Sequence, residues 1–395
     1  MSEMSYLEKL LDGVEVEWKT LEDISIKISS GGTPKTGVSE FYDGDIPWLR
    51  TQEVNFCDIW DTEVKITESG VKNSSAKWIP KNCVIVAMYG ATVGKIGINK
   101  IPMTTNQACA NIQLNEEVAH YRYVFHFLCS QYTYIKSLGT GSQTNINAQI
   151  VKNIKIPIPC PDNPEKSLAI QSEIVRILDT FTALTAELTA ELTMRKKQYN
   201  YYRDQLLSFD EGEVEWKTLG EVAVIGTGNH DTQDAIEHGK YIFYARGREP
   251  LKLNVFDFDE TAIITAGDGA GVGKVFHYAK GKYALHQRAY RIVPNAFMNP
   301  RFVYHYITAY FFTYIQKASV SSSVTSLRRP MFLKFPIPVP PSEEQARIVE
   351  ILDKFDTLTN SITEGLPREI ELRQKQYEYY RDLLFSFPKP EAVNK

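Results

Sequence analysis

The most regular hydrophobic pattern of the chain lies in residues 164–209, where large apolar side chains recur every seven positions. Beyond its first residue the segment contains no glycine or proline and is rich in helix formers. The pattern therefore predicts one long helix whose apolar stripe packs on another helix. At 1.5 Å per residue, about 45 residues would form a rod of roughly 70 Å that holds two parts of the protein apart. The stripe contains Ile174, Phe181 and Leu188 in one row and Ile177 and Leu184 in a second row.

Residues 342–387 repeat this segment. The block QSEIVRILD (171–179) corresponds to QARIVEILD (345–353), and KQYNYYRDQLLSF (197–209) corresponds to KQYEYYRDLLFSF (375–387). Two matched blocks in the same order indicate an internal duplication.

The two copies differ in the middle. The first copy contains the tetrapeptide TAEL twice in tandem, at residues 185–192, whereas the second contains EGLP at residues 364–367. Because glycine and proline disfavour a helix interior, we expect the distal helix to break or kink near Gly365 and Pro367.

Each helix segment follows a variable segment, and the two variable segments share landmarks in one order. The motif VEWKTL precedes both, so the layout is circular, and short strands with turn signals predict compact α+β or partly barrel-like domains. The shared landmarks are the strands 83–87 and 261–265, the glycine turns 90–95 and 269–274, Arg50 and Arg246, and the pairs Asn106–Gln107 and His286–Gln287.

These repeats predict five regions. An N-terminal segment with the first variable domain covers residues 1–163, and the central helix covers 164–209. The second variable domain covers 210–341, the distal helix covers 342–387, and a tail covers 388–395.

Composition narrows the class of protein. The net charge of −4 and the hydrophobic content of 43% suit a globular chain, so any nucleic-acid surface must be a local patch. Five scattered cysteines without C-x-x-C spacing argue against a disulfide framework or a zinc site. No apolar run approaches the roughly 18 residues of a membrane span. We therefore expect a soluble, cytoplasmic protein.

The motifs of several enzyme classes are missing. Lys95 and Lys274 end glycine turns, but no serine or threonine follows them, as a phosphate-binding loop requires. The Asn-Pro pairs at Asn163 and Asn299 lack the second proline of an adenine-methyltransferase motif. His126 lies on an aromatic helix and is expected in the core rather than at a metal. The sequence predicts no catalytic residue and no metal site.

What remains are polar loops with the side chains that contact DNA. Arginine, asparagine and glutamine read base edges, whereas lysine, serine and threonine contact phosphates; alternatively, these are ordinary solvated loops. The candidate DNA-binding residues are Thr33, Lys35, Thr36, Arg50, Gln52, Lys95, Asn106, Gln107, Ser142, Gln143 and Thr144 in the first domain, and Arg246, Arg248, Lys274, His286, Gln287, Ser322, Ser323, Arg328 and Arg329 in the second.

Two unlike domains on a duplicated helical frame predict a reader of a bipartite DNA site. Half-sites about 34 Å apart present the same groove on one face of the duplex. One extra TAEL lengthens a helix by about 6 Å and rotates it by roughly 40°, whereas one base pair adds about 3.4 Å and roughly 35°. The tandem TAEL is therefore a candidate ruler for the gap between half-sites; alternatively, it only fills the helix.

The two repeated blocks and the tandem TAEL resemble the specificity subunit of a type I restriction–modification system, in particular its type IC branch. The resemblance covers the whole chain. In the variable domains it is limited to the GGTPKT turn (31–36), IPW (46–48) and the strand after TNQ (105–107).

The resemblance implies an α+β fold with two α/β target-recognition domains separated by two long antiparallel, coiled-coil-like helices in a pseudo-two-fold duplication. It implies a non-catalytic subunit that reads an asymmetric bipartite DNA site, with the shorter spacer that two TAEL copies indicate. Two modification subunits would carry S-adenosylmethionine and methylate adenine. Restriction subunits would use ATP and Mg²⁺ to translocate and cleave unmodified DNA.

Apolar side chains outside the helix–helix stripe are candidates for docking these partners. They are Leu168, Ile170, Leu178, Leu352 and Leu358. Two other functions stay open at this point: a stand-alone tandem DNA-binding regulator, and a scaffold that links two proteins without binding DNA.

Overall fold

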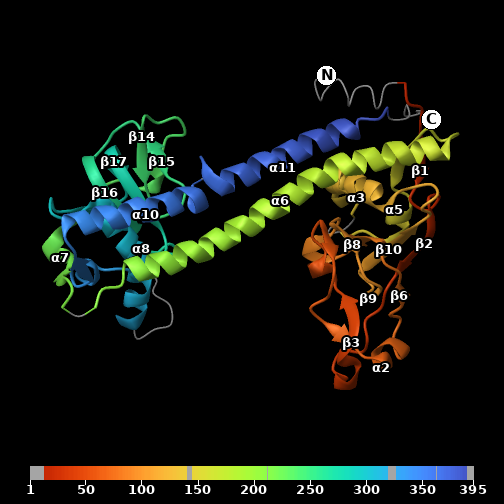
Figure 1. The fold of residues 1–395 in the computed structure, drawn as a ribbon, viewed down its shortest axis with the longest axis horizontal. Coiled ribbons are helices and arrows are strands. Elements are labelled where there is room, and N and C mark those ends of the chain that lie inside the picture. The colour runs from red at the N-terminus through yellow and green to blue at the C-terminus, as the bar shows by residue number, and fades with distance from the viewer. Residues whose placement is uncertain (1–12, 140–144, 211, 319–325, 362, 389–395) are drawn as a thin grey trace. The chain divides into compact units, whose positions relative to one another are not determined.

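The computed structural model describes residues 13–139, 145–210, 212–318, 326–361 and 363–388 (Figure 1). The chain divides into two compact units. Unit 1 comprises Met1–Glu187 with Ile370–Lys395, and unit 2 comprises Leu188–Glu369.

Unit 1 contains a five-stranded sheet, a four-stranded sheet and a two-stranded ribbon. The five-stranded sheet has the spatial order β2 (Ser25–Ser30), β10 (Cys109–Leu114), β7 (Val84–Ala87), β8 (Ile96–Asn99) and β4 (Cys57–Ile59). The four-stranded sheet has the order β5 (Lys65–Ile66), β3 (Tyr42–Leu49), β9 (Met103–Thr105) and β6 (Trp78–Ile79). The ribbon pairs β1 (Val16–Thr20) with β11 (Lys155–Pro159). The short helices are η1 (Ser39–Phe41), η2 (Thr51–Glu53), α2 (Glu68–Lys72), η3 (Gly90–Thr92), α3 (Tyr121–Ser130), α4 (Tyr132–Ser137) and α5 (Ala148–Lys152).

Unit 2 contains a six-stranded sheet and a two-stranded ribbon. Their strands, in spatial order, are β13 (Ala223–Thr227), β18 (Ala289–Pro294), β16 (Phe258–Ala266), β17 (Phe276–Leu285), β14 (Tyr241–Tyr244) and β15 (Leu251–Leu253); and β12 (Glu215–Thr218) with β19 (Pro336–Val339). The helices are α7 (Leu219–Val222), η4 (Thr232–Asp234), α8 (Pro300–Ala318) and α9 (Arg329–Leu333).

The predicted long helices are present. The central helix α6 (Pro164–Leu206) continues without interruption through both TAEL repeats (Figure 1). Proline suits its first position because that residue needs no N–H there, and the side chain of Asn163 accepts a hydrogen bond from the Lys166 N–H (3.0 Å).

The predicted break in the distal helix is confirmed. The distal segment consists of two helices, α10 (Ser342–Asn360) and α11 (Gly365–Leu384), which Figure 1 draws as separate ribbons. Gly365 has a φ of +76°, and a β-carbon on it would lie 2.4 Å from the Thr357 carbonyl oxygen. Only glycine fits this turn. Pro367 lies in the first turn of α11, where a missing N–H costs no hydrogen bond.

The central helix packs on the distal helices in antiparallel order. In unit 1 the rings of Phe181 and Tyr380 stack with centroids 5.2 Å apart. In unit 2 the rings of Tyr202 and Phe355 stack at 5.6 Å. Earlier residues of α6 thus meet later residues of the distal copy. The predicted fold class, with two α/β domains and two long antiparallel helices in a duplicated plan, is confirmed.

The repeated block QxxIVxILD packs on its own domain, and not on another helix as its apolar stripe predicts. Counted from its glutamine as position i, the residues at i+3, i+4 and i+7 are apolar and lie on one helix face. Ile174 and Leu178 are fully buried in the core of unit 1, and Ile348 and Leu352 are fully buried in that of unit 2. This face attaches each helix to its own domain.

The docking prediction is therefore wrong for three residues. Ile170, Leu178 and Leu352 are buried in the cores of their units, so their side chains cannot reach a partner. Leu168 and Leu358 are half-buried, and their docking role stays a prediction.

Candidate nucleic-acid interface

In unit 1, backbone hydrogen bonds bring the ends of several strands together. The Asn106 N–H donates to the Leu49 carbonyl (2.9 Å), and the Met88 N–H donates to the Ala108 carbonyl (2.8 Å). The Ile146 N–H donates to the Met88 carbonyl (3.0 Å), which ties the segment before α5 to the same place. We call this arrangement the loop frame.

Unit 2 repeats the loop frame. The His286 N–H donates to the Tyr244 carbonyl (3.0 Å), and the Gly267 N–H donates to the Arg288 carbonyl (2.8 Å). The Leu327 N–H donates to the Gly267 carbonyl (2.7 Å). The predicted correspondence of Asn106–Gln107 with His286–Gln287 is therefore confirmed.

The glycine turns also correspond as predicted. Gly90 and Gly269 have φ values of +80° and +81°, and Gly94 and Gly273 have values of +80° and +65°. These left-handed conformations strongly favour glycine, so the turns owe their glycines to backbone geometry.

The predicted pairing of Arg50 with Arg246 is off by one residue. Strand register places Leu49 beside Thr105 and Tyr244 beside Leu285, so Arg50 is equivalent to Ala245. The two arginines therefore leave equivalent strands at different positions.

Two cationic candidates of unit 1 are held by neighbouring side chains. Arg50 pairs with Glu53 (3.3 Å) and Glu63 (2.7 Å), so its guanidinium is oriented by two carboxylates. The Lys95 ammonium donates to the Asn55 side chain (2.8 Å).

Asn106 and Gln107 have different environments. The Asn106 side chain accepts from the Ala108 N–H (3.1 Å), so it caps the turn. Gln107 is exposed, and its carbonyl oxygen accepts a hydrogen bond from the Thr33 hydroxyl. Lys35, Thr36 and Gln52 are also exposed.

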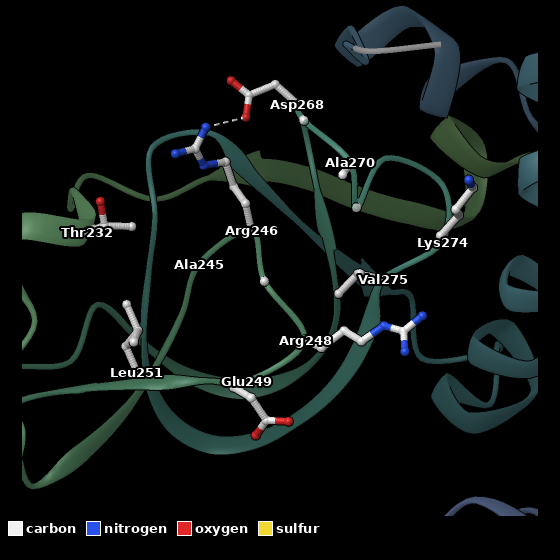
Figure 2. A pocket seen from close by; sticks show the side chains of 13 residues that line it. Thr232, Ala245, Arg246, Arg248, Glu249, Leu251, Asp268, Ala270, Lys274 and Val275 are labelled. Atoms are coloured by element: carbon white, nitrogen blue, oxygen red, sulfur yellow. Dashed lines mark hydrogen bonds and ion pairs between the residues drawn. The ribbon is translucent and has the colours of Figure 1, made fainter. Parts of the chain in front are cut away.

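In unit 2, three cationic candidates line one hollow of about 660 Å³ (Figure 2). Arg246 and Arg248 come from the loop after β14, and Lys274 comes from the glycine turn between β16 and β17. The Lys274 ammonium lies 5.0 Å from the centroid of the Phe312 ring.

Asp268 orients two arginines at the edge of this hollow. Its carboxylate oxygens accept from Arg246 Nη1 (2.8 Å) and from Arg288 Nη1 (3.1 Å). The pKa of Asp268 lies below its usual value, mainly because of the hydrogen bond from Arg246 and to a smaller extent because of the one from Arg288. Sequence reasoning missed Arg288, although it directly follows the candidate Gln287.

The prediction that His286 contacts DNA is wrong, because its side chain is only 1% exposed. The next residue, Gln287, lies in the turn that follows and is exposed, and its side chain donates to Asp231 (2.9 Å). Arg328 and Arg329 are exposed at the start of α9. Ser142, Gln143, Thr144, Ser322 and Ser323 lie outside the described residues.

A polar network fastens α6 to the first domain. Asp179 accepts hydrogen bonds from Arg122 Nη2 (2.8 Å) and His126 Nε2 (2.8 Å). Eight residues earlier, on the same helix face, Gln171 accepts from the His120 N–H (2.9 Å) and donates to the Val118 carbonyl (3.0 Å). His126 is fully buried, as its predicted place in the core requires.

The same network recurs in the second domain. Asp353 accepts from Arg301 Nε (2.7 Å) and His305 Nε2 (2.7 Å). Gln345 accepts from the Asn299 N–H (2.7 Å) and donates to the Pro340 carbonyl (2.9 Å). We call these two networks the helix clamps. The first and last residues of QxxIVxILD are thus the polar ends of the helix face that binds the domain. Two polar residues beside an apolar stripe were the sequence signal that could have predicted this role.

The first clamp makes the stability of unit 1 depend on pH. Burial lowers the pKa of His126 below its ordinary value of about 6.5, and neutral His126 donates to Asp179 while its Nδ1 pairs with the Tyr377 hydroxyl (2.9 Å). The unfolded chain therefore binds a proton near pH 6 that the folded chain does not, and stability falls as pH drops below about 6.5. We expect a lower unfolding temperature at pH 5.5 than at pH 7.5. The His126→Asn variant should show a weaker pH dependence, and an equal one would contradict this assignment.

Two further features are absent from the residues that the structure describes. No helix in these ranges is long and apolar enough to cross a membrane. No group of three or more His, Cys, Asp or Glu side chains there could hold a metal ion.

The chain matches the family model described as the type I restriction modification DNA specificity domain, over residues 13–194 and again over residues 211–372. It is 42% identical to the Escherichia coli type I restriction enzyme EcoR124I/EcoR124II specificity subunit, with 100% of both chains covered. It is 40% identical to the E. coli EcoprrI specificity subunit, with 92% of this chain and 93% of that one covered.

The fold is also found in a solved structure. The type I S subunit from M. genitalium superposes with a TM-score of 0.65 at 17% identity and covers 96% of this chain and 98% of its own. Both halves of the sequence match one domain model, and both carry the same loop frame and helix clamp. The chain therefore belongs to the family of type I restriction–modification specificity subunits, whose role is DNA sequence specificity rather than catalysis.

Proposed function

We propose that each recognition domain reads one half of an asymmetric bipartite DNA site through the residues around its loop frame. One observation carries this proposal: the two domains share a backbone frame but present different side chains on it. A common frame gives both domains the same docking geometry, and different side chains give different base preferences.

Gln107 and Gln287 illustrate this division. They occupy equivalent exposed positions, but Thr33 donates to the amide oxygen of Gln107, whereas Asp231 accepts from the amide nitrogen of Gln287. The first amide keeps its NH₂ group for a ligand and the second keeps its oxygen. Since adenine and other bases differ in their donors and acceptors, such amides are suited to contact base edges.

In this proposal the long helices set the length of the gap between the half-sites. The α6 helix is continuous through both TAEL repeats, so each inserted TAEL would change helix length and rotation together. If the chain belongs to the type IC branch, as the tandem TAEL suggests, its two repeats would give the shorter spacer variant of that branch.

Two modification subunits are proposed to dock on the repeated block KQYxYYRD. Tyr201 is 63% exposed and its counterpart Tyr379 is 55% exposed, so the duplication offers two equivalent contact points. Exposed tyrosines are frequent anchors of protein interfaces. The modification subunits would supply S-adenosylmethionine-dependent adenine methylation. Restriction subunits would supply cleavage with ATP and Mg²⁺, and the assembly would act in the cytoplasm.

The two tyrosines give a stoichiometric test of docking. We expect Tyr201→Ala or Tyr379→Ala to remove one modification subunit from the complex, and the double variant to remove both, as measured by multi-angle light scattering. Met194→Ala, another exposed apolar position on α6, is the matched control. If the double variant still binds two subunits, the docking surface lies elsewhere.

DNA binding itself is tested with the purified chain, alone and with its modification subunits. We expect weak binding by the chain alone, and tight, salt-sensitive and sequence-specific binding by the complex. Equally tight, specific binding by the chain alone would favour a stand-alone regulator. No DNA binding in either form would favour a scaffold.

A further inference from the structure

Arg246, Asp268 and Arg288 form a cluster in the second domain that is not repeated at the equivalent described positions of the first. We call it the arginine–aspartate cluster. In the loop frame, Met88 is equivalent to Gly267 and Ala108 to Arg288. Asp268 is therefore equivalent to Tyr89, and neither a carboxylate nor a second arginine occupies these positions in unit 1. The cluster is thus a chemical difference between the two domains on an otherwise shared frame.

The cluster holds its arginines in fixed directions. The two carboxylate oxygens of Asp268 each accept from one guanidinium, at 2.8 Å for Arg246 and 3.1 Å for Arg288. Arg246 lines the hollow of about 660 Å³, and Arg288 lines a second hollow of about 260 Å³ together with Gln287. Among the described residues, the other guanidinium N–H groups of both arginines have no hydrogen-bonding partner. The side chain of Arg246 is 39% exposed and that of Arg288 is 63% exposed, so a ligand can reach both arginines.

The chemistry of the cluster favours a base edge over a phosphate. A carboxylate beside the guanidinium repels phosphate oxygens and reduces the charge of the cluster to +1. An arginine that is already oriented loses less conformational freedom on binding, and its planar fork matches two acceptors in one plane. Guanine presents two such acceptors, O6 and N7, in the major groove, whereas adenine presents one donor and one acceptor there.

We propose that Arg246, oriented by Asp268, reads a guanine in the half-site of the second domain, with Arg288 bracing Asp268 from the other side. Asp268 is then a positioning residue. This inference rests on the proposed function and adds to it the base that one named side chain recognises.

The test uses the complex of this chain with its modification subunits and a duplex that carries the bipartite motif methylated in cells. Each G·C pair of both half-sites is replaced in turn by A·T, and binding is measured by fluorescence anisotropy over a series of salt concentrations. The variants are Arg246→Ala, Arg246→Lys and Asp268→Asn. The matched control is Arg248→Ala, which removes an exposed arginine from the same hollow but not from the cluster.

We expect Arg246→Ala to weaken binding of the intact motif by about 5- to 150-fold. The variant should no longer distinguish G·C from A·T at one position of one half-site, with all other preferences unchanged. Arg246→Lys should lose the same preference because an ammonium cannot form the bidentate contact, and Asp268→Asn should weaken that preference alone. Arg248→Ala should weaken all duplexes alike and reduce the salt slope by about one.

Two results would overturn the inference without touching the proposed function. Arg246→Ala could weaken all duplexes alike with a smaller salt slope, which would make Arg246 a phosphate contact, or it could leave every affinity unchanged. If the unaltered complex shows no sequence preference at all, the proposed function itself fails.

Discussion

Replacing Leu352 by alanine is expected to lower the free energy of unfolding by about 2–5 kcal/mol. The side chain is fully buried in the core of unit 2, next to Ile348 on the face of α10 that packs on the domain. Truncation removes apolar contacts and leaves a cavity that a well-packed core cannot close. Thermal and denaturant unfolding of the full chain measure the loss.

Leu358→Ala is the matched control for this prediction, because Leu358 lies on the same helix but is only half-buried. It should cost clearly less than Leu352→Ala. A normal unfolding temperature for Leu352→Ala, combined with loss of the modification subunit, would instead restore Leu352 as a docking residue.

Replacing Asp179 by alanine is expected to cost about 2 kcal/mol of stability in unit 1. Breaking a buried ion pair costs about 3–5 kcal/mol, and the 32% exposure of the Asp179 side chain reduces that figure because water screens the charges. The variant leaves His126 without its acceptor in a fully buried position. Arg122 keeps Asp58, to which its Nη1 donates at 3.0 Å, so the loss is partial.

The Asp179→Ala variant also separates stability from DNA recognition. A loosened clamp lets the domain change its angle to α6, so we expect the complex to accept duplexes with gaps one base pair shorter or longer more readily than the unaltered protein. Ser172→Ala, an exposed change on the same helix, should alter neither property. Unchanged stability and unchanged gap preference in Asp179→Ala would show that the clamp does not position the domain.

The helices were predictable because their signals are local. A long run without glycine or proline, and seven-residue periodicity, are enough to predict α6. The EGLP segment is enough to predict the break before α11, since φ at Gly365 is positive and Pro367 suits only a first turn. The duplication was visible in the repeated sequence blocks, and the structure shows it again in the loop frame that both domains share.

Assignments that depend on tertiary neighbours were not predictable. Periodicity shows that Leu178 and Leu352 lie on an apolar stripe, but it does not show whether a domain, another helix or another protein packs on that stripe. The same limit applies to His286, which the loop frame turns inward, and to Arg288, whose importance rests on Asp268 twenty residues away. Asp268 itself carries no motif, and only the folded backbone brings it between the two arginines.

The most direct test of the central claim is methylome sequencing of cells that express the intact system, first with this chain and then with its Arg246→Ala variant. We expect a motif of two different half-sites around a gap of fixed length, with methylated adenines. In the variant, a single position of one half-site should become degenerate. A single uninterrupted motif, or a variant that alters both half-sites, would contradict the claim that two unlike domains read the DNA independently.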